Sequence, residues 1–128
     1  MNPLPITSLI AGVLAIILVP LSVQITWRRA KMNAVFGDAG DETLRRRVRA
    51  HGNFIEYAPL ALIALGLVEY GGATPWVVWL LGGGFLLSRI LHAIGMLFTS
   101  TPTLRVLAML MNHSSFLASG IWLVAQSV

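Results

Sequence analysis

The chain has 128 residues, of which 56% are hydrophobic and only 11% are charged. A soluble domain carries about 25% charged residues, so this chain lacks the polar surface that contact with water on all sides requires. Its mean hydropathy is +0.78, and a helix needs about 20 apolar residues to cross a bilayer. Four such spans with short connections would use nearly the whole length, which leaves no room for an independent soluble domain.

The formal net charge is +4, and the chain contains no cysteine. Disulfides, thiolate metal sites and cysteine nucleophiles are therefore excluded. The basic residues are concentrated between Arg28 and Arg49. In a membrane protein such a concentration is a topology signal, so no nucleic-acid partner is expected. Because these residues follow the first apolar segment, that segment is expected to be an uncleaved anchor.

The apolar runs and the helix breakers between them predict four spans. A polar stretch, Gly71-Gly72 and Thr101-Pro102 separate these spans, which are residues 5–31, 44–70, 75–98 and 103–125. The expected fold is all-α, an integral membrane four-helix bundle in one domain, residues 1–128, surrounded by membrane lipids. The basic first connection is expected in the cytoplasm, which places both termini outside.

The second expected span carries a polar stripe at membrane depth. Arg49, Asn53 and Glu56 are separated by four and three residues, so they share one face of a helix. Arg89 and His92 form a second polar pair in the third span. Ionisable groups at this depth are costly and face a bundle interior or an aqueous cavity. The two sets are therefore expected to line one polar cavity, near the cytoplasmic side.

The charges inside the expected spans do not balance. Three arginines, at positions 49, 89 and 105, accompany one acid, Glu56. An unmatched buried cation is costly, so the cavity is expected to take an anion from elsewhere, and a ligand with two carboxylates would supply it. The alternative that needs no ligand is a structural ion-pair network among Arg49, Glu56 and Arg89.

Other polar residues have simpler interpretations. No metal site is expected, because the three histidines lack the spacing of known zinc motifs. The consecutive arginines 45–47 are expected to be a run that faces solvent or lipid headgroups.

The segment from Arg47 to Pro59, RVRAHGNFIEYAP, resembles the signature of the MAPEG family, the membrane-associated proteins in eicosanoid and glutathione metabolism. That signature is R-A-[H/Q]-x-N-x-x-E followed closely by proline. SRILHAIGM in the third span is similar to the family's second arginine segment, and the short loops are similar to those of small bacterial members. The resemblance implies a homotrimer of four-helix bundles in a bacterial inner membrane. Glutathione would bind between neighbouring subunits near the cytoplasmic face.

The resemblance also implies roles for individual residues in binding glutathione. Arg49 and Asn53 would hold its carboxylate and backbone groups, and Glu56 would meet its ammonium. Tyr57 matches a tyrosine that some members place against the tripeptide, and Arg89 matches the third-span arginine of the site. Glutathione brings two carboxylates and one ammonium, which agrees with the surplus of arginines and with the single acid.

Arg105 matches the arginine that stabilises the glutathione thiolate in the family, and it is the expected catalytic residue. Arg28 or Arg29 would be the first-span arginine that reaches the site, with Arg29 counted among the binding residues. A free thiol has a pKa of about 8.5, and an adjacent guanidinium lowers it. The implied function is a glutathione-dependent transferase or peroxidase. Its second substrate would be a hydrophobic small molecule, a lipophilic electrophile or hydroperoxide.

Three positions depart from the family pattern. Met96 and Met109 stand where eicosanoid-making members have tyrosines, and Val106 stands where some members have serine. Eicosanoid specificities are therefore not expected. These departures keep open a non-catalytic membrane protein that binds a lipid or an acidic metabolite in the same intersubunit cavity. A transporter or channel is disfavoured, because residues 60–68 are apolar and leave no continuous polar path.

Overall fold

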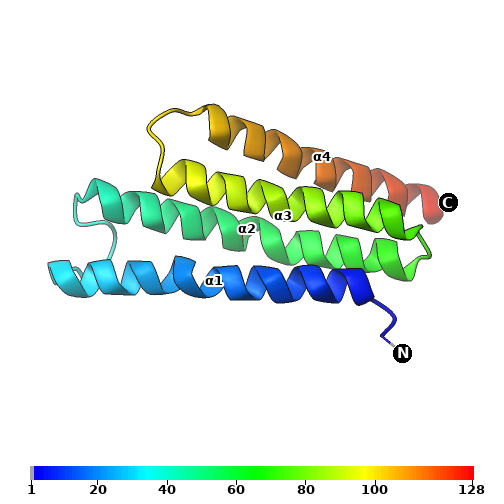
Figure 1. Cartoon of the computed structure of the whole chain (residues 1–128), viewed down its shortest axis with the longest axis horizontal. Coiled ribbons are helices and arrows are strands. Elements are labelled where there is room, and N and C mark those ends of the chain that lie inside the picture. The colour runs from blue at the N-terminus through cyan, green and yellow to red at the C-terminus, as the bar shows by residue number, and fades with distance from the viewer. Residues whose placement is uncertain (1) are drawn as a thin grey trace.

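A computed structural model describes residues 2–128 as four helices and the connections between them (Figure 1). The helices are α1 (Pro5–Met32), α2 (Glu42–Tyr70), α3 (Pro75–Leu97) and α4 (Thr103–Gln126). Each is long and apolar enough to cross a membrane, and the described residues contain no strand. The expected all-α membrane bundle is confirmed.

The helices α2 and α3 form the middle of the bundle. Each contacts the other, and both contact α1 and α4, whereas α1 and α4 do not touch within residues 2–128. Figure 1 shows α1 and α4 on opposite sides, with the α1–α2 and α3–α4 connections at one end. Residues on α2 and α3 are therefore best placed to build a site inside the bundle.

The apolar side chains follow the division that a membrane bundle requires. A continuous core is formed by inward residues such as Ile10, Phe54 and Phe85. Large apolar side chains also cover the outside of every helix, for example Ile16, Leu60, Leu80 and Leu117. Because nothing in residues 2–128 covers these outward side chains, they suit contact with lipid.

Asp41 joins the end of α1 to the start of α2. Its carboxylate accepts from Leu44 N at 2.6 Å and so caps α2, which therefore begins two residues earlier than the sequence predicts. The same carboxylate accepts from Arg28 Nε at 3.1 Å and Arg28 Nη2 at 2.7 Å. The hydrogen bond from Arg28, followed by that from Leu44, holds the pKa of the Asp41 carboxyl below its usual value.

Glu69 joins α2 to α1 at the opposite end of the bundle. Its two carboxylate oxygens accept from Ile6 N at 2.9 Å and from Thr7 N at 2.8 Å. These amides are in the first turn of α1, where they lack partners inside the helix and the helix dipole favours a negative charge. Glu69 therefore caps a helix that lies more than 60 residues away in the sequence.

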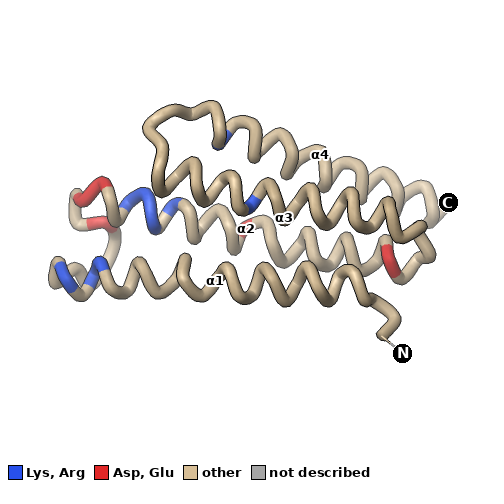
Figure 2. The backbone as a smooth tube through the Cα atoms, viewed as in Figure 1, with Lys and Arg blue, Asp and Glu red and all other residues tan. Residues whose placement is uncertain are grey.

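The charged residues gather at the end of the bundle that carries the α1–α2 connection (Figure 2). Residues 28–47 contain six lysines and arginines and three acids. The opposite half of the bundle is almost free of charge, apart from Glu69 in the last turn of α2. The positive surplus therefore lies at one end, and Arg49 and Arg89 extend it toward the middle.

Candidate functional site

The packing of α2 divides its polar stripe between two surfaces. Arg49 and Glu56 are exposed, whereas Asn53 is half-buried and reaches α3 and α4. Within residues 2–128, neither Arg49 nor Glu56 forms an ion pair or a side-chain hydrogen bond. The alternative prediction of a structural ion-pair network among Arg49, Glu56 and Arg89 is therefore wrong for a single chain. The charges of Arg49 and Glu56 remain on the outside of the bundle.

Arg89 is buried inside the bundle, with 1% of its surface exposed. Its Nη1 donates to Asn53 Oδ1 at 2.5 Å, and its Nε donates to Ser88 Oγ at 3.2 Å. The guanidinium carbon also lies 5.2 Å from the ring centre of Tyr57 and 5.4 Å from that of Phe85. Neutral dipoles and aromatic faces therefore hold this cation, and no carboxylate of the described chain neutralises it.

Met109 brings α4 to this cluster. Its sulfur accepts from Arg89 Nη2 at 3.8 Å and from Asn53 Nδ2 at 3.9 Å. One turn along α4, the His113 ring meets the Tyr57 ring edge-on, with 6.0 Å between their centres. The structure thus brings together Asn53, Tyr57 and Arg89 from the expected binding set, with Met109 in contact with two of them.

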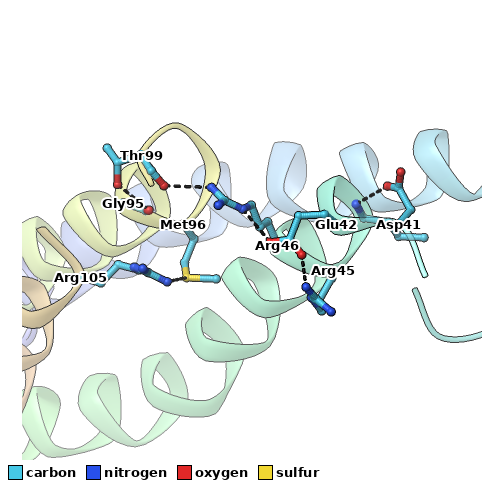
Figure 3. A network of polar contacts seen from close by, with 9 residues as sticks. Asp41, Glu42, Arg45, Arg46, Gly95, Met96, Thr99 and Arg105 are labelled. Atoms are coloured by element: carbon cyan, nitrogen blue, oxygen red, sulfur yellow. Dashed lines mark hydrogen bonds and ion pairs between the residues drawn. The ribbon is translucent and has the colours of Figure 1, made fainter. Parts of the chain in front are cut away.

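Arg105 lies at the start of α4, beside a groove between α3 and α4. Its Nη1 donates to Met96 Sδ at 3.6 Å (Figure 3), and its Nε is buried without a partner in the described chain. The groove has a volume of about 480 Å³ and is lined by His92, Met96, Pro102, Arg105, Val106, Met109, Leu110 and His113. Met109 lines this groove and also contacts Arg89, so this one side chain connects the groove to the buried cluster.

Gly95 permits the close approach of α3 to Arg105, a role that the sequence did not reveal. A methyl group at this position would lie 2.8 Å from Arg105 Cγ and 3.3 Å from Arg105 N. Thr99 Oγ1 donates to Gly95 O at 2.8 Å, and Arg46 Nη1 donates to Thr99 O at 2.9 Å (Figure 3). The start of α2 therefore braces the end of α3 next to Arg105.

The arginines 45–47 do not form one solvated run. Arg45 is exposed and pairs only with Glu42, as a solvated residue would. Arg46 and Arg47 are half-buried, and Arg47 Nη1 donates to Gln24 O on α1 at 2.9 Å. The prediction is therefore wrong for these two arginines, because Arg46 donates to Thr99 O and Arg47 to Gln24 O, which holds both against neighbouring parts of the bundle.

The two arginines of α1 have different partners. The ion pair with Asp41 holds Arg28, whereas Arg29 donates from Nη2 to Gly37 O at 3.2 Å. The Nε of Arg29 is buried without a partner in residues 2–128. Of the two, Arg29 is therefore the one with a buried donor that lacks a partner in residues 2–128, although no hydrogen bond or ion pair connects it to the Arg89 cluster.

His92 and His113 both line the groove, and none of its lining residues carries a carboxylate. Residues 2–128 contain no group of three histidines, cysteines or acids that could hold a metal. The groove is cationic, because Arg105 lines it and the buried Arg89 contacts its lining residue Met109. Its chemistry therefore suits an anion with a soft or apolar portion near Met96 and Met109.

The comparison with known proteins agrees with this architecture. The MAPEG family model matches residues 7–125, so the chain belongs to the MAPEG family. The resemblance of its arginine signature is thus confirmed, and the chain is an integral membrane protein whose apolar surface contacts lipid.

Two curated relatives are bacterial. The chain is 31% identical over 90 residues to the inner membrane protein YecN of Escherichia coli K12. The aligned residues make up 70% of this chain and 69% of YecN. YecN of Escherichia coli O6:H1 matches with the same identity and coverage. No solved structure matches the chain significantly. The name of these relatives gives them an inner-membrane location and specifies no activity.

Proposed function

We propose that this protein is a glutathione-dependent transferase or peroxidase that acts on lipophilic electrophiles or hydroperoxides. The observation that carries the proposal is the position of Arg49 and Glu56, which are exposed at membrane depth without partners in the described chain. Charges in that position need a partner from a ligand or a second subunit. Glutathione supplies carboxylates for the arginines and an ammonium for Glu56.

The proposed binding site lies between subunits of a homotrimer. Arg49, Asn53, Glu56 and Tyr57 of α2 would meet the tripeptide, with Arg89 behind them and Arg29 reaching from α1. The buried Arg89 supports this arrangement, because its neutral partners leave its positive charge available to an anion. The oligomer also explains why α2 presents charges outward in a protein whose other outward residues are mostly apolar.

In the proposed mechanism, Arg105 stabilises the thiolate of glutathione. A guanidinium beside a thiol lowers the thiol pKa and raises the fraction of nucleophile at neutral pH. In a transfer reaction the sulfur attacks the electrophilic carbon, a carbon–sulfur bond forms and the halide or other group leaves. In a peroxidase reaction two glutathione molecules supply two electrons, and the products are an alcohol, water and the disulfide. The groove beside Arg105 supports a meeting of thiol and apolar substrate.

The test is conjugation of glutathione to a generic aromatic halide by the purified protein. The wild type should exceed the uncatalysed rate, and Arg105→Ala should reduce kcat at least about 100-fold, as loss of one oxyanion-type donor does. Glutathione binding by the variant, measured by calorimetry, should persist. Wild-type rates equal to background across several halides and hydroperoxides would refute an enzymatic role.

A second candidate is a non-catalytic protein that binds a lipid or an acidic metabolite in the same cavity. The contact of Arg105 with Met96 favours it, because a thioether is a weak acceptor that does little to orient a guanidinium. Calorimetry separates the two candidates. Glutathione binding without turnover, or binding of another acidic compound in its place, supports the second.

A further inference from the structure

A second basic pocket lies at the charged end of the bundle, away from the groove beside Arg105. It is enclosed by the end of α1, the first turns of α2 and the end of α3, and its volume is about 340 Å³. Its lining residues are Gln24, Glu42, Thr43, Arg46, Arg47, Leu97 and Phe98. None of these belongs to the proposed glutathione site.

The pocket contains more hydrogen-bond donors than acceptors. Arg47 uses Nη1 for Gln24 O, and no other atom of its guanidinium has a partner within residues 2–128. The Nε2 of Gln24 is buried and donates to nothing in the described chain. A buried donor without an acceptor destabilises the protein, so a ligand that supplies an acceptor here is favoured.

The charge of the pocket points to an anion. Arg46 and Arg47 bring two cations, and Glu42 brings the only carboxylate among the lining residues. That carboxylate is already shared between Arg46 and Arg45. The remaining positive charge, together with several separate donors, suits a group with several strongly accepting oxygens.

We propose that this pocket binds a phosphate group through Arg46, Arg47 and Gln24. Phe98 is largely exposed at the rim and Leu97 lies beside it, so acyl chains could follow an apolar surface below a bound headgroup. Basic pockets between transmembrane helices bind anionic headgroups in this manner. The phosphate belongs to an anionic phospholipid or to a soluble phosphate ester, since both present the same oxygens.

Native mass spectrometry of the full chain in detergent distinguishes these sources. The probe in the mass spectrometer is dioctanoyl phosphatidylglycerol, and dioctanoylglycerol is the control that lacks phosphate. A separate thermal-shift titration uses inorganic phosphate as the second probe. Retention of the phospholipid alone identifies a headgroup site. Stabilisation by inorganic phosphate at similar concentrations identifies a site for soluble phosphates. If neither probe binds better than dioctanoylglycerol, the proposal is wrong.

Three variants locate the binding. Arg47→Gln should weaken binding at least about tenfold, since it removes a charged donor from the phosphate. Gln24→Leu should weaken it severalfold while keeping the bond from Arg47, which ends on the backbone carbonyl of residue 24. Lys31→Gln is the matched control, because Lys31 is an exposed cation at the same end of the bundle that neither lines the pocket nor pairs with a residue that does. It should change binding less than twofold, and an effect equal to that of Arg47→Gln would mean diffuse attraction and overturn the site.

Discussion

Arg89 and Arg49 are both charged at membrane depth, but the bundle accommodates them in different ways. Arg89 is almost fully buried and has Asn53, Ser88 and two aromatic rings around it. Arg49 is exposed on α2 and has no partner within the described chain. One protomer can therefore complete the surroundings of an inward cation, whereas an outward cation in lipid requires a ligand or a neighbouring subunit.

Neither arginine has its positive charge cancelled by a carboxylate of the described chain. The partners of Arg89 are neutral, so its positive charge is solvated by dipoles and is not cancelled. Arg49 lies near Glu56 in sequence but forms no ion pair with it. Both arginines therefore contribute to one positive field, which favours anions.

The largest expected effect comes from disturbing the inward half of the site. Gly95→Ala places a methyl group 2.8 Å from Arg105 Cγ and 3.3 Å from its backbone nitrogen. Overpacking of this kind costs up to about 3 kcal/mol. We expect a lower melting temperature in detergent and loss of any catalysis by Arg105.

Gly83→Ala is the matched control for that substitution. Its added methyl group meets no atom within 4 Å, and alanine in a helix is favoured over glycine by about 0.5–1 kcal/mol. The control should be neutral or more stable. Equal losses for both variants would show that α3 does not depend on close approach at Gly95.

The partner of Arg89 provides a two-directional test. Asn53→Ala removes the acceptor at 2.5 Å and should cost about 2 kcal/mol, because a buried donor is left unsatisfied. Asn53→Asp should raise the stability of the ligand-free protein, since it gives the buried cation a carboxylate. The same variant should weaken glutathione binding by repelling its carboxylates. Thermal denaturation with and without glutathione measures both effects, and a destabilised Asn53→Asp variant would contradict the view that Arg89 lacks a counter-charge.

The outward residues should behave differently. Arg49→Gln and Glu56→Gln remove exposed groups without intrachain partners, so each should change protomer stability by less than about 0.5 kcal/mol. Both should nevertheless reduce glutathione affinity in calorimetry. A large loss of stability without any change in affinity would assign these residues to the protomer's own packing.

The smallest expected effect is a loss of folding stability at low pH, and it arises at Asp41, outside the site. Hydrogen bonds from Arg28 and Leu44 lower the pKa of the Asp41 carboxyl in the folded state. Its stabilising contribution is therefore complete above the unfolded pKa of about 3.9 and is lost as pH falls through the lower, folded pKa. Thermal denaturation between pH 6 and pH 2 should show a smaller decline for Asp41→Asn than for the wild type. Parallel declines would assign the acid sensitivity to other carboxylates.

The sequence was sufficient for the helices, because they depend on local patterns. Long apolar runs separated by Gly71-Gly72 and Thr101-Pro102 predict the four spans. The arginine signature predicts where polar chemistry enters the membrane. The helix periodicity placed Arg49, Asn53 and Glu56 on one stripe, as the spacing requires.

The sequence could not predict how neighbouring helices divide that stripe. Asn53 lies at its edge and is drawn inward by Arg89, while Arg49 and Glu56 stay outside. The capping of α1 by Glu69 joins residues more than 60 positions apart. Such contacts depend on which helix ends lie side by side, and local sequence patterns do not predict that arrangement.

The most direct measurement is native mass spectrometry of the detergent-purified protein with added glutathione. We expect a trimer that retains up to three glutathione molecules, and we expect Arg49→Gln to lower the retained number. A wild-type monomer, or a trimer that retains no glutathione, would contradict the claim that the outward charges of α2 are completed by an anionic ligand between subunits.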